Sequence, residues 1–269
     1  MTEPGNPYAA PRAKIVAVPP ETSPDGPLRL RSEPLVVPAG AGQEWLGESW
    51  RVFRKAPGTL IAMVLLYILI GFAMGMLPGV GDLFMSLTFG IWSAGWVLAS
   101  DRLYRGEELS VASLFAGFRH PRTGRLFVIG LVYLGMMLAV FAATLAIAVA
   151  LLGVSSLDAL AGLDPASLVL PLVLIIFLLV TGLFLVFAWV GYAPVLVSMH
   201  DIEVLPACRL SMRAILGNWR AMTVYGLLLT GLGIASVFTL FIGMLVLLPM
   251  VFIVSYLSYR QIFLVGEVS

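Results

Sequence analysis

The chain contains 269 residues, of which 60% are hydrophobic and 12% are charged, and its formal net charge is +1. So few charged side chains cannot cover a water-soluble globule of this length, so the composition excludes that class and predicts an integral membrane protein. The nearly neutral charge gives no indication of a nucleic-acid partner, and we expect none.

The N-terminal residues 1–42 form a proline-rich segment. Residues 1–40 hold nine of the seventeen prolines of the chain, including the adjacent pair Pro19 and Pro20. Proline breaks the interiors of helices and sheets, and this stretch has few large apolar side chains to bury. We therefore expect a disordered cytoplasmic tail, followed by a membrane domain at residues 43–269.

Three amphipathic segments are predicted in the membrane domain, and each precedes a pair of apolar segments. They lie at about residues 43–55, 109–119 and 205–220. In the first, Leu46, Trp50 and Phe53 recur at helical spacing, whereas the charged side chains fall on the opposite face. A helix with aromatic residues on one side and basic residues on the other lies in the headgroup layer, so we expect three interfacial helices.

Six segments are apolar and long enough to cross a bilayer, because about 20 apolar residues span ~30 Å of hydrocarbon. We expect these spans at about residues 57–77, 80–100, 126–152, 168–198, 221–242 and 244–263. Each interfacial helix forms one unit with the two spans that follow it, and all three units enter the membrane from the same side. The predicted fold class is therefore an all-α integral membrane protein with six transmembrane helices in three parallel pseudo-repeats.

The basic residues follow the positive-inside pattern. The connections after the first, third and fifth spans contain no Lys or Arg, and Asp82, Asp158 and Asp164 are their only charges. All positive charge lies in the N-terminal segment, in the connections after spans two and four, and at the C-terminus. We therefore expect a multi-pass protein of the bacterial inner membrane with both termini in the cytoplasm.

Basic side chains next to the spans are candidates for contact with anionic lipid headgroups, at ~1 kcal/mol for each residue near the surface. The alternative is that they only set the orientation of the chain. The candidate headgroup contacts are Arg51, Arg54, Lys55, Arg119, Arg122, Arg125, Arg209, Arg213 and Arg220. The candidate interfacial anchors are the aromatic residues Trp45, Trp50, Phe115, Phe118 and Trp219. The expected partner is the lipid bilayer, and anionic lipids in particular.

The spans offer no residues for catalysis or for metal binding. Their cores contain no Asp, Glu, Lys or Arg, which argues against an ion-coupled carrier of polar solutes. His120 and His200 lie at span boundaries without a second metal ligand, and Ser255 has no His or Lys at comparable depth. The single cysteine, Cys208, is expected to be an inert apolar residue. We therefore expect no enzyme, no cofactor and no metal.

Several boundary motifs carry a resemblance to a known family. They are residues 114–119 (LFAGFR), Ser211, the pair Asn218 and Trp219, and residues 258–263 (SYRQIF). In these motifs the chain resembles a family of proteobacterial inner-membrane proteins with six helices that is named only after a genomic locus. The resemblance covers roughly residues 43–263, and it implies a topology but no activity, because none is established for the family. The layout is more loosely similar to the membrane portion of some glycerophosphodiester phosphodiesterases, whose catalytic domain is missing from this chain.

The sequence predicts a non-enzymatic accessory or scaffold protein at the cytoplasmic face of the membrane. The alternative is a permease or lipid-handling protein for an apolar or amphipathic substrate, with kinks at Pro194 and Pro249 in its spans. Gly71 and Gly75 form a GxxxG match, which favours either a homodimer face or packing within the six-helix bundle. These observations leave a protein partner or a homo-oligomer open.

Overall fold

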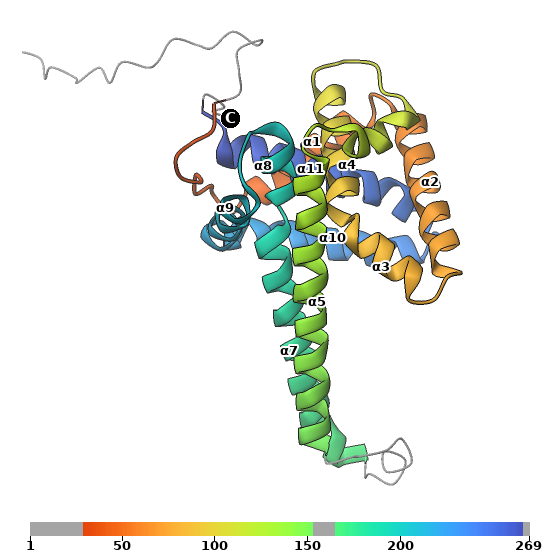
Figure 1. Cartoon of the computed structure of the whole chain (residues 1–269), viewed down its shortest axis with the longest axis vertical. Helices are drawn as coiled ribbons and strands as arrows, with labels where there is room; N and C mark the ends of the chain where they lie inside the picture. The colour runs from red at the N-terminus through yellow and green to blue at the C-terminus, as the bar shows by residue number, and fades with distance from the viewer. Residues whose placement is uncertain (1–28, 153–164, 266–269) are drawn as a thin grey trace, which may run out of the picture.

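The structure is a computed structural model that describes residues 29–152 and 165–265. Within these residues it is all-α, and Leu30 and Leu264 form an isolated antiparallel bridge outside any strand. The helices are α1 (Ala41–Phe53), α2 (Pro57–Gly75), α3 (Val80–Leu87), α4 (Phe89–Tyr104), the 3-10 helix η1 (Val111–Arg119), α5 (Thr123–Leu152), α7 (Pro165–Val190), α8 (Ala193–Met199), α9 (Val204–Gly217), α10 (Trp219–Val237) and α11 (Met244–Phe263) (Figure 1). The predicted all-α class is confirmed.

Among the described residues, five helices are long and apolar enough to cross a membrane. They run over Pro57–Gly75, Thr123–Leu152, Leu168–Met199, Trp219–Val237 and Met244–Phe263. The pair of α3 and α4 meets the same criterion as one unit, although it is bent by 49°. The chain is therefore a membrane protein with several candidate spans, and the predicted number of six is reached when the bent pair is included.

The predicted span at residues 80–100 is not one straight helix, because it divides at Thr88 into α3 and α4. The Thr88 hydroxyl donates to the Phe84 carbonyl at 2.6 Å and accepts the Trp92 indole N–H at 3.0 Å. A threonine hydroxyl that bonds to the preceding turn competes with the helical ladder and bends the helix. The expectation of a continuous helix is therefore wrong at this point.

The predicted span at residues 168–198 is also divided, between Val190 and Ala193, into α7 and α8. Pro194 lies in the first turn of α8, where the N–H that proline lacks has no partner within the helix. The break therefore falls at Pro194, as the sequence predicts. Pro249, in contrast, lies inside the single helix α11.

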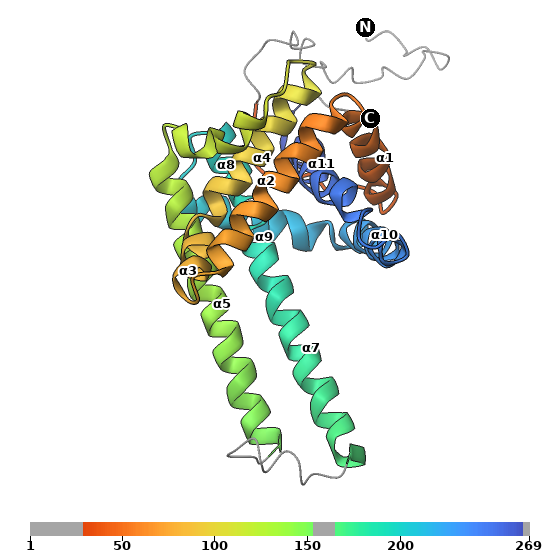
Figure 2. The same ribbon diagram turned by 90° about the vertical axis from the view of Figure 1, so that its right-hand side faces the viewer.

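The helices do not form one parallel bundle. In Figure 1, α5 and α7 project as a long hairpin beyond the rest of the molecule, and α10 and α11 run across the direction of that hairpin. Figure 2, turned by 90°, shows the same crossing. The largest fully buried side chains include Trp96, Tyr256 and Phe263, so the core lies around α4 and α11 at the broad end of the molecule. Farther from this core, α5, α7 and α10 expose apolar side chains, as helices that face lipid do.

Small residues allow close helix packing at some crossings and not at others. A Cβ atom added to Gly130 of α5 would clash with the carbonyl of Leu87, the last residue of α3. The backbones of α3 and α5 are therefore in direct contact. Gly71 and Gly75 behave differently, because a Cβ atom at either would meet no described atom within 4 Å. The GxxxG match is therefore not used for packing within the described part of the chain.

Part of the predicted N-terminal tail has a defined structure. Residues 29–35 lie along the end of α11, where the Arg31 N–H donates to the Phe263 carbonyl at 2.7 Å. The last carbonyls of a helix have no partner within it, and these residues supply one. The boundary of the disordered tail at residue 42 is therefore wrong, whereas residues 1–28 of the predicted tail lie outside the described residues.

The three predicted interfacial segments all contain helices, at α1, η1 and α9. The second differs from the expected α-helix, because η1 is a 3-10 helix of nine residues. α9 begins at Val204, so Pro206 falls in its first turn, where proline is tolerated. Each of these helices precedes a pair of apolar segments in the chain, as the hydropathy pattern predicts.

Candidate functional site at the charged end

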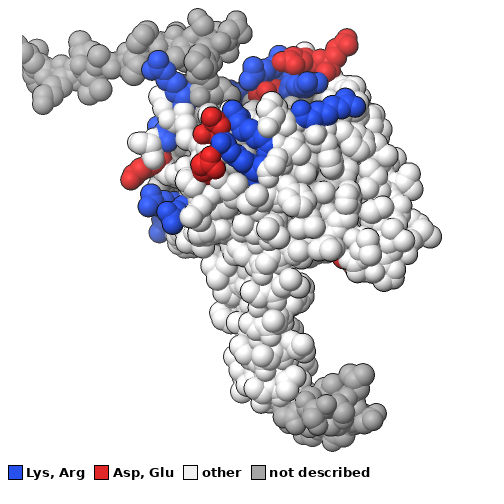
Figure 3. Space-filling view, in the orientation of Figure 1, with Lys and Arg blue, Asp and Glu red and all other residues white. Residues whose placement is uncertain are grey.

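The charged side chains gather at one end of the molecule. Figure 3 shows Lys, Arg, Asp and Glu at the broad end, whereas the projecting hairpin is white on the face in view. In the described residues these side chains belong to helix ends and connections, including the end of α4, η1, the start of α5 and the α8–α9 connection. Asp82, in the first turn of α3, lies apart from them in the chain.

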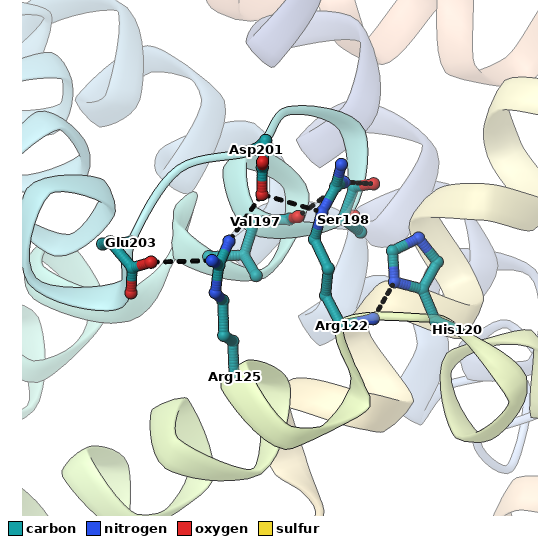
Figure 4. Close-up of polar contacts among 7 residues, drawn as sticks. All are labelled: His120, Arg122, Arg125, Val197, Ser198, Asp201 and Glu203. Atoms are coloured by element: carbon teal, nitrogen blue, oxygen red, sulfur yellow. Dashed lines mark hydrogen bonds and ion pairs between the residues drawn. The ribbon is translucent and has the colours of Figure 1, made fainter.

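An ion-pair node, formed by Arg122, Arg125, Asp201 and Glu203, joins the start of α5 to the α8–α9 connection (Figure 4). Arg125 contacts two carboxylates, at 2.7 Å from Asp201 Oδ1 and at 2.7 Å from Glu203 Oε1. Arg122 Nε lies 3.3 Å from the same Asp201 oxygen. The side chains of Arg122 and Arg125 are 29% and 33% exposed, and those of the carboxylates are more exposed. Water therefore screens each ion pair, so a single pair adds little to stability, and the node acts mainly by positioning the two segments.

Arg122 also caps the end of α8. Its guanidinium donates to the carbonyls of Val197 and Ser198, at 3.2 and 3.0 Å. These carbonyls lie at a helix C-terminus, where a positive charge is favoured and the backbone acceptors lack partners. The backbone N–H of Arg122 donates in turn to His120 Nδ1 at 3.2 Å (Figure 4). A single residue therefore connects the η1–α5 turn to the end of α8.

Burial and the node shift the pKa values of three groups. The hydrogen bond from Arg125, reinforced by the charges of Arg125 and Arg122, holds the pKa of Asp201 below its usual value. Burial, and then the positive charge of Arg122, lowers the pKa of His200. The same two causes lower the pKa of His120, against an opposing backbone hydrogen bond with Ser198. Both histidines therefore favour the neutral form near neutral pH.

We expect the melting temperature to fall as the pH is lowered from about 7.5 to about 5. A histidine whose pKa is lowered in the folded state is protonated more readily in the unfolded chain. The folded state therefore begins to lose stability as the pH falls through the unfolded pKa of about 6.5. Asp201 loses its contribution only below about pH 4, outside this window. His200→Gln keeps a side chain that can bond to Tyr259, and it should flatten the decline. An unchanged slope in this variant would contradict the contribution of His200.

Two residues of the resemblance motifs bind backbone groups where helices break. Ser211 of α9 donates to the Ala188 carbonyl at 2.9 Å and accepts the Tyr192 N–H at 3.0 Å, so it bridges the break between α7 and α8. Asn218, between α9 and α10, is 2% exposed and accepts the Val37 N–H at 2.7 Å. Buried polar backbone groups need such partners, so both side chains support the fold.

The last motif, at residues 258–263, ties α11 to other helices. Its polar side chains pair with distant residues: Ser258 with Tyr192 at 2.8 Å, Tyr259 with His200 at 2.6 Å and Gln261 with Trp45 at 2.6 Å. The guanidinium of Arg260 lies 4.0 Å from the centre of the Tyr104 ring, a cation–π distance. The motif residues therefore act as connections between helices at the charged end.

The structure gives three of the predicted headgroup contacts other partners. Arg122 and Arg125 bind protein groups in the ion-pair node, so their guanidinium groups already have partners within the fold. Lys55 Nζ donates to the carbonyls of Leu103 and Tyr104, each at 3.3 Å, and so caps the end of α4. A cation at this end of a helix satisfies orphan carbonyls and the helix dipole.

The other basic candidates stay exposed. Arg51 pairs with Glu48 at 3.0 Å on the surface of α1. Arg119, Arg209 and Arg213 are exposed and form no ion pair with any carboxylate in residues 29–152 or 165–265. Two further guanidinium groups lie over neighbouring rings: Arg54 over Trp50 at 6.0 Å and Arg220 over Trp219 at 5.4 Å. The residues in this set without an acidic partner remain available to a surface outside the protein.

The candidate interfacial anchors also include both buried and exposed side chains. Trp45 is 4% exposed and bonds to Gln261, so it packs inside the fold and the expectation that it contacts the interface is wrong. Phe115 is half-buried, with its ring 5.6 Å from that of Trp92. The exposed aromatic candidates are Trp50, Phe118 and Trp219.

Four exposed residues form the basic face of α9: Leu205, Arg209, Arg213 and Leu216. Side chains three or four residues apart lie on one side of a helix, so these four form a single stripe. The opposite side of α9 is buried, and it includes Cys208. Burial raises the pKa of the Cys208 thiol to about 11, so little reactive thiolate forms near neutral pH.

An open pocket of about 460 Å³ lies between α4 and η1 at the charged end, lined in part by Asp101, Arg102 and Arg119. Asp101 already accepts the Tyr256 hydroxyl at 2.6 Å and pairs with Arg105 at 3.1 Å. Within the described residues, no group of three or more His, Cys, Asp or Glu side chains could hold a metal ion. The polar groups at this end therefore bind mainly one another.

Comparison with known proteins gives one informative match. A protein of Burkholderia thailandensis, described as a probable inner membrane protein, is 27% identical over 253 residues, which cover 86% of this chain and 94% of the relative. The chain is similar to an inner-membrane protein. The name of this relative is taken from a genomic locus, so the match confirms the resemblance to a group of inner-membrane proteins named in that way. It also agrees with the several candidate membrane spans of the structure. No protein-family model and no solved structure matches the chain.

Proposed function

We propose that this inner-membrane protein is a non-enzymatic accessory or scaffold protein, whose charged end lies at the cytoplasmic face. In this proposal both termini are cytoplasmic, and the three units of interfacial helix and hairpin are parallel pseudo-repeats. The distribution of basic residues supports the orientation, because no Lys or Arg lies in the connections after the first, third and fifth predicted spans.

The observation that carries the proposal is how the polar groups of the charged end are used. The arginines of the ion-pair node bind carboxylates and the end of α8, and His200 binds Tyr259. Asp101 is held by Tyr256 and Arg105 in the same manner. Groups arranged in this way fix helices relative to one another. The cores of the predicted spans, in addition, carry no charged side chain that could relay a proton or bind an ion.

The partner that best fits the basic face of α9 is the anionic surface of the bilayer. Arg209 and Arg213 have no ion pair among the described residues, and Leu205 and Leu216 flank them on the same stripe. Trp219, which follows directly, is also exposed. Basic and large apolar side chains on one exposed helix suit the boundary between headgroups and acyl chains.

We expect the double variant Arg209→Gln with Arg213→Gln to retain anionic lipid less well. Each arginine near the surface contributes ~1 kcal/mol, so the loss should be roughly 10- to 30-fold in apparent affinity. Native mass spectrometry after release from nanodiscs that contain phosphatidylglycerol would measure it. The control, Arg51→Gln with Arg105→Gln, removes the same charge from two residues that already have acidic partners. Equal retention in both double variants would contradict the assignment of the α9 face.

A lipid-handling protein is the second candidate, because the projecting α5–α7 hairpin exposes apolar side chains along much of its length. Acyl chains can approach such a surface directly, whereas a polar solute gains nothing there. Vesicles that contain the purified protein and a fluorescent phospholipid separate the two proposals. The scaffold proposal expects transbilayer movement no faster than in protein-free vesicles. Faster movement would place lipid handling first.

A further inference from the structure

The turn between α10 and α11 is the most exposed apolar segment of the described chain. We call residues 238–242 the hairpin tip. The exposed fractions of its four apolar side chains are high: Phe238 87%, Leu240 85%, Phe241 62% and Ile242 65%. The sequence carries no charged residue from position 221 to position 259, so no charge keeps this tip in water. A patch of this kind on a monomer marks contact with a membrane or with another protein.

The backbone holds these side chains outward at a conformational cost. Leu240 and Phe241 both have positive φ angles, 52° and 62°, in the left-handed region that residues other than glycine rarely enter. The turn is closed from inside, because the Phe241 N–H donates to the Ser236 carbonyl at 2.9 Å and the Gly243 N–H donates to Thr239 Oγ1 at 3.2 Å. Two bulky residues in strained conformations at an exposed site indicate a part of the molecule with a role outside the fold.

The length of the α10–α11 hairpin limits how far from the headgroup layer its tip can lie. α10 has 19 residues and is ~28 Å long, no more than the ~30 Å of the hydrocarbon layer. It begins at Trp219 and Arg220, an exposed aromatic–basic pair suited to the headgroup boundary. Figures 1 and 2 show α10 and α11 crossing the direction of α5 and α7, so at least one of the two hairpins is strongly tilted. α5 has 30 residues and is ~45 Å long, so it crosses the layer even when tilted. α10 is long enough to cross only when it stands nearly upright, so a tilted α10 ends before the far side of the layer.

We propose that the α10–α11 hairpin ends inside the membrane, with its tip covered by the acyl chains of the bilayer. The tip then meets hydrocarbon with the apolar side chains that it exposes, and no charged group has to leave water. The backbone N–H groups of residues 238–243 already have acceptors within the turn, which lowers the cost of placing it in lipid. The turn before α3 provides the contrast, because it contains Asp82, whose charge belongs in the headgroup layer or in water. This proposal goes beyond the proposed function and does not depend on it.

Site-directed labelling in liposomes tests the proposal. In a Cys208→Ala background, which has no other cysteine, a new cysteine is placed by Phe238→Cys or by Leu240→Cys in the tip, and by Asp82→Cys as the reference. A thiol in hydrocarbon forms little thiolate, so a water-soluble maleimide should label both tip variants at least ~10-fold more slowly than Asp82→Cys. Phe238 lies outside the left-handed residues, so Phe238→Cys gives the answer even if Leu240→Cys disturbs the turn.

A spin label on the same cysteines identifies what covers the tip. Acyl chains dissolve oxygen and exclude polar nickel complexes, so the proposal predicts strong relaxation by oxygen and weak relaxation by nickel at both tip positions. Asp82→Cys should give the reverse order. Labelling of the tip as fast as that of Asp82→Cys would overturn the proposal. Protection from both reagents would overturn it as well, because the tip would then be buried against protein, such as a second copy of the chain.

Discussion

Asn218→Ala is expected to lower the free energy of unfolding by about 2–4 kcal/mol, since each buried backbone group left without a partner costs about 1–3 kcal/mol. The Asn218 side chain accepts the Val37 N–H at 2.7 Å and donates to the Leu35 carbonyl at 2.9 Å. Alanine removes both bonds, and it also removes the bond to the Ala214 carbonyl at the end of α9. The segment before α1 would then lose its attachment to the α9–α10 junction.

Unfolding of the purified protein in detergent measures this loss, and amide hydrogen exchange at Val37 locates it. The control is Thr223→Val, one turn farther along, because the exposed Thr223 hydroxyl bonds only to the carbonyl of the preceding turn. Its effect should stay within about 0.5 kcal/mol. An effect of Asn218→Ala no larger than that of this control would contradict a stabilising role for the Asn218 hydrogen bonds.

Gly130→Ala is the second substitution with a large expected effect, a destabilisation of about 1–3 kcal/mol from overpacking. The new Cβ atom would overlap the Leu87 carbonyl, which is backbone at the end of α3 and cannot move aside as a side chain can. Relief therefore requires α3 and α5 to separate. Where association depends on close backbone approach, this separation removes the packing that holds the two helices together.

Gly135→Ala, in the same helix, is the matched control. A Cβ atom at Gly135 meets no described atom within 4 Å, so the added methyl group is free of clashes and alanine favours the helix. We expect this variant to be neutral or more stable by up to about 1 kcal/mol. Thermal unfolding of the two variants side by side gives the comparison. Similar losses in both would show that a general effect of the methyl group, and not the contact with Leu87, is measured.

The parts of the fold that the sequence predicts are those that depend on local hydropathy. Runs of apolar residues predict the candidate spans because burial in lipid requires about 20 of them in sequence, whatever the neighbouring helices do. The amphipathic segments that become α1 and α9 follow from the 3.6-residue period in the same way. The break at Pro194 is local too, since proline lacks the N–H that would continue the helix.

The parts that could not be predicted depend on partners far away in the sequence. Arg125 and Asp201 are 76 residues apart, and nothing in either segment indicates the other. Trp45 fits an interfacial pattern as well as Trp50 does, but it is buried where α1 packs against α11, and its indole N–H donates to Gln261 there. Asn218 carries a signal of this kind in the sequence, because a polar amide between two apolar helices needs hydrogen-bond partners once it is buried.

The projecting hairpin and the charged end differ in what their side chains contact. α5 and α7 are long and mostly lipid-facing, whereas the groups that bind one another lie where the helices meet. The ion-pair node fixes the start of α5 to the α8–α9 connection, and thereby to the helix that carries the basic face. Binding of headgroups to α9 would therefore act directly on the base of the long hairpin.

The orientation of the charged end toward the cytoplasm can be measured with alkaline phosphatase fusions, because this enzyme becomes active only in the periplasm. A fusion after Arg119, at the end of η1, should be inactive, and a fusion after residue 160, between the third and fourth predicted spans, should be active. Expression of both fusions is compared by immunoblot. Activity after Arg119 together with inactivity after residue 160 would contradict the orientation and the assignment of the charged end to the cytoplasmic face.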